Sequence, residues 1–85
     1  MSAPNLLNIA ATTVAERHEQ YGSAKPLFEH IAKRWTLVLS TEVTPAQVAL
    51  CLIDLKMARL VHAPNHDDSI IDVAGYAACL KEVQS

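Results

Sequence analysis

Apolar residues recur at three- and four-residue steps along most of the chain, which is the spacing of one face of an α-helix. Proline, glycine and acidic residues divide this pattern into four segments, at residues 4–20, residues 26–39, residue 45 to just before Pro64, and about residues 67–83. The best strand candidate, residues 36–40, only continues the helical stripe of the second segment. The pattern therefore predicts an all-α fold, a compact bundle of about four helices in a single domain over residues 1–85.

Helix ends carry recognisable local signals. Gly22 suits the left-handed conformation that closes a helix, and the segment Thr44-Pro45-Ala46-Gln47 has the form of a capping box. Asp67 and Asp68 fall in the first turn of the fourth helix, where negative charge complements the positive helix end. These signals set the expected boundaries.

The apolar pattern also predicts how the helices pack. The third helix is apolar nearly all round, so we expect it to be the central one. Gly75 lies in the middle of the fourth helix and would permit a close crossing against the third. The second helix has an expected inward stripe, formed by Phe28, Ile31, Ala32, Trp35, Val38 and Leu39.

Composition adds an expectation about assembly. The chain has 85 residues, of which 51% are hydrophobic and 19% charged. A domain of this size buries only about 60% of its unfolded-chain surface, so association would cover more apolar area. We therefore expect a homo-oligomer, with a homodimer as the simplest form.

Charge and hydropathy exclude two classes of partner. A net charge of −2 gives no electrostatic footprint for a nucleic acid polymer. The longest apolar run, Val48 to Ile53, is far short of the ~20 residues that span a bilayer. The first residues lack the charged and apolar regions of a signal peptide, so the expected location is the cytoplasm.

The cysteines and histidines suggest little chemistry. Cys51 and Cys79 have no metal-binding spacing and are expected to be small buried hydrophobes. His62 and His66 flank Pro64 beside two aspartates, which is compatible with a transition-metal site or with a polar loop. The spacing matches no zinc signature, which favours the loop.

Two acidic pairs are the first candidate site. Glu16 and Glu19 share a face of the first helix, and Asp68 and Asp72 share a face of the fourth. Four carboxylates from two helices could hold Mg²⁺ or Mn²⁺, which prefer oxygen ligands. The structural alternative is that the glutamates are solvated surface and that Asp68 caps a helix.

Basic residues are the second candidate. Lys56 and Arg59 share a face of the otherwise apolar third helix, where they need partners. They either pair with Asp72 or contact a phosphate, for which arginine is suited. At the end of the first helix, Arg17 could reach a phosphate and Tyr21 could stack on a base. The structural alternative for both is helix-end surface.

Taken in order, several motifs resemble a family of small phage and prophage proteins of unknown function. They are the string from Glu16 to Gly22, then Phe28, Ile31, Ala32 and Trp35, then Thr44-Pro45 before Val48-Ala49-Leu50, then Lys56-Met57-Ala58-Arg59-Leu60, and finally His66-Asp67-Asp68-Ser69 with Asp72-Val73-Ala74-Gly75-Tyr76-Ala77. The resemblance covers nearly the whole chain.

That family is in turn distantly similar to the all-α, MazG-like nucleoside triphosphate pyrophosphatases. Their chemistry implies Mg²⁺ held by carboxylates on two helices and cleavage between the α and β phosphates. The first helix here offers only Glu16-x-x-Glu19, and the second pair has a four-residue step. The resemblance implies metal ligands at Glu16, Glu19, Asp68 and Asp72, catalytic roles for Glu19 and Asp72, and phosphate contacts from Lys56 and Arg59. Arg17 and Tyr21, from the end of the first helix, are the other candidate nucleotide contacts.

Two functional hypotheses follow from different classes. The first is a phage-type nucleotide-binding protein or Mg²⁺-dependent nucleoside triphosphate pyrophosphohydrolase. The second is a non-enzymatic phage protein that binds and modulates a host protein through a helical surface, and a purely structural oligomerisation unit is a third. The sequence leaves open whether the protein is an enzyme.

Overall fold

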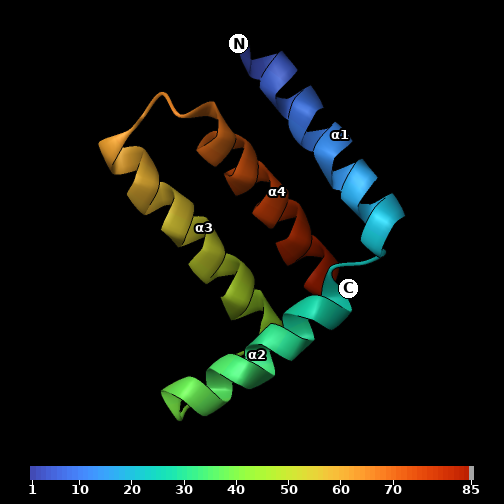
Figure 1. Ribbon diagram of the computed structural model, residues 1–85, viewed down its shortest axis with the longest axis vertical. Helices are drawn as coiled ribbons and strands as arrows, with labels where there is room; N and C mark the ends of the chain where they lie inside the picture. Colours follow the sequence, from blue (N-terminus) through green and yellow to red (C-terminus); the bar gives the residue numbers. More distant parts are fainter. Residues whose placement is uncertain (85) are drawn as a thin grey trace.

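A computed structural model describes residues 1–84 as four helices (Figure 1). They are α1 (Ala3–Tyr21), α2 (Lys25–Leu39), α3 (Pro45–His62) and α4 (Asp67–Val83). No strand occurs in this range, which confirms the all-α class and the four helices, with boundaries that agree within about one residue. None of the helices described is long and apolar enough to cross a membrane.

The helix ends follow the local signals in the sequence. The Thr44 hydroxyl accepts the Gln47 N–H at 3.1 Å, and the Gln47 side chain accepts the Thr44 N–H at 2.9 Å, so the predicted capping box is confirmed. Gly22 has a φ of +76°, which favours glycine, and its N–H donates to the His18 carbonyl at 2.8 Å. The chain therefore leaves α1 at the expected residue.

Three of the helices form a flat layer. α4 lies between α1 and α3, and α2 crosses the end of the layer against α3 and α4 (Figure 1). The molecule measures 41 × 32 × 18 Å. Within residues 1–84, α1 contacts α4 and neither of the other helices.

The expectation that the third helix is central is wrong, since α4 is the helix that contacts all three others. The reason lies in the two sides of α4. Small residues, including Ala74 and Ala78, let α1 approach on one side, while Tyr76 and Leu80 belong to the packing around the core that α3 and α2 form. The apolar residues of α3 that point away from both neighbours are left exposed.

The buried core lies where α2, α3 and α4 meet. It consists of Phe28 and Ala32 from α2 with Val48 and Ala49 from α3, and Val48 is 0% exposed. The expected inward stripe of α2 is correct in its first half and wrong at Val38, which is 79% exposed, and at Leu39. These residues are uncovered because the last turn of α2 projects beyond α3 (Figure 1).

Gly75 does not mark a close crossing, contrary to the expectation. A Cβ built on this residue would meet no atom within 4 Å. Gly75 lies three residues after Asp72, and the space beside its Cα is open. The glycine is not required there by packing.

Candidate functional site

An ion pair joins the two long antiparallel helices of the layer. Lys56 Nζ lies 3.0 Å from Asp72 Oδ2, and the lysine side chain is only 16% exposed. A mostly buried ammonium group needs such a partner, so the structural pairing that the sequence left open is present. Arg59 follows Lys56 on the same side of α3 and is exposed.

Further charges extend this pair along α4. Asp68 and Asp72 share one face of α4 with Cys79, at four- and seven-residue steps. The positive charge of Arg17, on α1, lowers the pKa of the Cys79 thiol in part, so this cation acts near the Cys79 end of the face. We call this surface the charged face: Asp68, Asp72 and Cys79 on α4, with Lys56 from α3 on one side and Arg17 from α1 on the other.

Cys79 is the one group on the charged face whose pKa is clearly shifted among the described residues. Partial burial raises the pKa of its thiol above the ordinary value, the nearby Glu82 carboxylate raises it further, and Arg17 lowers it in part. The thiol is therefore protonated at neutral pH. Cys51 is exposed on α3, so the expectation that both cysteines are buried is wrong for this residue.

The first acidic pair lies elsewhere. His18 and Val14 line the contact with α4, and Glu16 stands about 200° round the helix from each of them. Glu16 and Glu19 are accordingly exposed on the outer side of α1. Tyr21, at the end of the helix, is 76% exposed.

One chain thus gathers part of the predicted site. Arg17, Lys56, Asp68 and Asp72 lie along the charged face, while Glu16 and Glu19 do not join them. Over the part of the chain that the structure describes, no three histidine, cysteine or acidic side chains are grouped closely enough to hold a metal ion. A carboxylate set within one chain would be limited to Asp68 and Asp72.

Glu82 makes a connection that sequence reasoning missed. Its carboxylate pairs with the His18 imidazole of α1 and accepts the Ala24 N–H, at the start of α2, at 3.0 Å. Ala24 has no side-chain cap of its own, so Glu82 satisfies a free N–H at this helix end. Because 58 residues separate Ala24 from Glu82, no local spacing could have signalled the contact.

His66 was a candidate for a metal site or a polar loop, and it serves as the N-cap of α4. With Nδ1 unprotonated, its ring accepts the Ser69 N–H at 3.3 Å and lies 2.7 Å from Ser69 Oγ. Ser69 is almost fully buried. The three-residue step from His66 to Ser69 was a usable signal, because N-caps accept the N–H of the third helical residue.

Comparison with known proteins identifies relatives. A model of a domain of unknown function, DUF6378, matches residues 5–84. The chain belongs to the DUF6378 family. It is 40% identical over 70 residues to the Gene 55 protein of Mycobacterium phage L5 and 35% identical over 68 residues to the Gene 55 protein of Mycobacterium phage D29. The expected likeness to phage proteins is confirmed.

The same comparison limits what these relatives imply. The matches cover 81% and 80% of this DUF6378 chain but 45% of each relative, so the chain spans less than half the length of the curated proteins it matches. No solved structure matches the chain. The distant similarity to MazG-like pyrophosphatases therefore stays a prediction.

Proposed function

We propose that this protein binds the phosphates of a nucleotide on the charged face, and that with Mg²⁺ it hydrolyses a nucleoside triphosphate between the α and β phosphates. The observation that supports this proposal is the row of charged groups along one face of α4. Asp72 pairs with Lys56 of α3, Asp68 lies one helical turn before it, and Arg17 of α1 acts on Cys79, seven residues after it.

The donor set agrees with how magnesium is usually held. Mg²⁺ in nucleotide sites takes one or two protein carboxylates together with phosphate oxygens and water. Asp68 and Asp72, one helical turn apart, offer two carboxylates of this kind. When bound, the ion would neutralise phosphate charge and lower the pKa of a coordinated water.

The cations have distinct roles in the proposal. Lys56 holds Asp72 in one orientation while no ligand is present, and it is close enough to contact a phosphate bound beside that carboxylate. Arg17 and the exposed Arg59 would add charge-assisted hydrogen bonds to phosphate oxygens. Tyr21, being exposed at the end of α1, is free to stack on a base.

Glu16 and Glu19 are the other two carboxylates predicted to bind the metal ion. In one chain they stand apart from the aspartates, so we propose Asp68 and Asp72 as the magnesium carboxylates. The catalytic role of Glu19 that the family resemblance implies is tested separately, by measuring the turnover of a variant without its carboxylate. A Glu19→Gln variant with unchanged turnover would remove Glu19 from the site.

The test is release of pyrophosphate and phosphate from a panel of ribo- and deoxyribonucleoside triphosphates, with Mg²⁺ and with Mn²⁺. We expect metal-dependent pyrophosphate release that Asp72→Asn abolishes. Asp54→Asn, an exposed carboxylate on α3 outside the charged face, is the matched control and should keep full activity. Circular dichroism of each variant separates loss of activity from loss of fold.

A flat result across the panel would overturn the hydrolase and favour the second candidate, a non-enzymatic protein that binds a host protein through a helical surface. The supporting observation is the uncovered end of α2, where Leu37 is 81% exposed and Val38 is similarly open. The expected result is a stoichiometric bacterial partner that is captured by the wild-type protein and lost in Leu37→Lys.

A further inference from the structure

The broad face of the layer opposite the charged face carries apolar residues from α1, α3 and α4, with the exposed carboxylate of Asp54 among those of α3. On α4, Val73 follows Asp72 by 100°, away from the charged side. Lys56 of α3 faces Asp72 of α4, and the two helices run antiparallel. In this arrangement the next residue on each helix, Met57 on α3 and Val73 on α4, lies toward the same broad face of the layer. We call this surface the apolar face, and its defining residues are Ala11, Ala15, Leu50, Met57, Val73 and Ala77.

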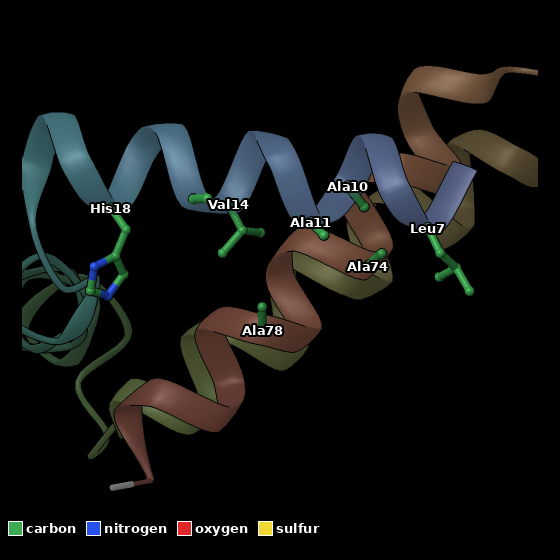
Figure 2. Close-up of a pocket in the computed structure, with 8 residues that line it drawn as sticks. Leu7, Ala10, Ala11, Val14, His18, Ala74 and Ala78 are labelled. Carbon is green, nitrogen blue, oxygen red and sulfur yellow. The ribbon is translucent and has the colours of Figure 1, made fainter. Parts of the chain in front are cut away.

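A groove lies between α1 and α4 where the two helices cross (Figure 2), and Ala11 and Ala15 of the apolar face belong to its lining. Its volume is about 420 Å³, and its walls are mainly small side chains such as Ala11 and Ala15 from α1 and Ala74 and Ala78 from α4. Alanines leave the two helix backbones close together with a hollow above them. Such a hollow receives larger side chains from another helix.

Large side chains stand on the other part of the same face. Leu50 and Met57 are seven residues apart on α3, so they share one helix face. They are 52% and 50% exposed. The apolar face therefore has a ridge on α3 and a groove between α1 and α4, with α4 between them.

The exposed area of the chain is larger than a monomer of this mass should show. A folded 9.3 kDa protein is expected to expose about 5,000 Å², whereas this chain exposes 5986 Å². The radius of gyration is 13.7 Å, against about 12 Å for a typical domain of this length. The excess of about 1,000 Å² is comparable with the ~800 Å² or more that each partner buries in a stable interface.

We infer that the apolar face is covered by a second copy of this chain in a two-fold dimer. With the two-fold axis parallel to α4, the α3 ridge of each copy lies on the α1–α4 groove of the other. A two-fold interface requires this kind of self-complementarity, in which one residue pair occurs twice. α3 and α1 run in opposite directions beside α4, so Leu50 and Ala15 lie at about the same height along the α4 axis. Rotation about an axis parallel to α4 therefore brings Leu50 of one copy over Ala15 of the other.

The dimer leaves the charged face outside, so its existence does not depend on the proposed nucleotide chemistry. The experiment is sedimentation equilibrium or light scattering of the full chain over a range of concentrations. We expect a wild-type mass of twice 9.3 kDa and a monomer mass for Met57→Glu. Leu37 is 81% exposed on α2, a helix that contributes none of the defining residues of the apolar face, so Leu37→Lys is the matched control and should stay dimeric.

Ala15→Glu gives an independent reading from the groove side. Ala15 is exposed on α1 within a single chain, so this variant should fold even if Met57→Glu does not, and circular dichroism checks the fold. We expect its dimer dissociation constant to rise at least about tenfold, as for a loss of a central contact. A wild-type chain that stays monomeric, or a dimer that survives Ala15→Glu and dissociates in Leu37→Lys, would overturn the inference.

Discussion

α4 meets α3 on one side and α1 on the other, and the two contacts are built differently. The α3 side belongs to the same body as the buried core of Phe28 and Val48, and it holds the Lys56–Asp72 ion pair. The α1 side is lined largely by alanines with an open groove above them, and Ala10 is the one residue of α1 that is buried. α4 thus packs tightly with α2 and α3 on one side and makes a looser contact with α1 on the other.

The difference shows that similar helical patterns can carry very different amounts of stability. α1 is the longest helix, with 19 residues, yet it contributes little to the core. Burial of large apolar side chains provides most of the stabilising free energy, and these side chains come from α2, α3 and α4. We therefore expect α1 to open locally at a lower free energy than the rest of the molecule.

The largest effect should come from the core side. Phe28→Ala removes a buried aromatic ring and is expected to lower the free energy of unfolding by about 3–5 kcal/mol. Val14→Ala on the α1 side removes two methyl groups from a partly buried site and should cost less than about 1 kcal/mol. Urea denaturation measures both values, and equal losses for the two variants would contradict the comparison.

An intermediate effect is expected at Glu82, the carboxylate that links α1 and α2 to the end of α4. Glu82→Ala leaves the Ala24 N–H without its acceptor and His18 without its partner. The expected loss is about 1–2 kcal/mol.

Hydrogen exchange shows where that loss falls. Exchange in α1 should quicken more than exchange in α3 in Glu82→Ala. A double-mutant cycle with His18→Ala isolates the contribution of the ion pair. Uniform acceleration over all four helices would mean that α1 is not a separately opening unit.

The smallest effect concerns the two thiols and leaves the fold unchanged. Burial and the Glu82 charge raise the pKa of Cys79, so its thiolate fraction at neutral pH is smaller than that of an ordinary thiol, and the thiolate is the reactive form. Alkylation with iodoacetamide should therefore modify the exposed Cys51 first. Mass spectrometry locates the label, and raising the pH should narrow the difference. Faster labelling of Cys79 would place that thiol outside the packed region.

Much of the fold could be predicted from the sequence because its signals are local. The capping box at Thr44, Gly22 at the end of α1 and the acidic first turn of α4 each act within a few residues. Apolar periodicity located the helices for the same reason. The Lys56–Asp72 pair could also be anticipated, because a cation on an apolar helix needs a partner.

The arrangement of the helices could not be predicted in the same way. The apolar residues of α3 suggested a central helix, but Leu50 and Met57 face outward, and periodicity does not distinguish a surface covered within the chain from an uncovered one. The separation of Glu16 and Glu19 from the aspartates depends on which side of α1 meets α4. That choice is made by Ala10 and Ala74, whose small size gives only a weak signal in a sequence.

The position of α4 has a consequence for how the chain is made. α4 is the last of the four helices to be synthesised, and it is the only contact of α1 within residues 1–84. The first helix must therefore remain without its tertiary partner until more than sixty later residues have been added, as the His18–Glu82 pair shows. Contacts of such long separation slow folding. If the ribosome paused before α4, the residues of α1 would have no helix of the chain to pack against.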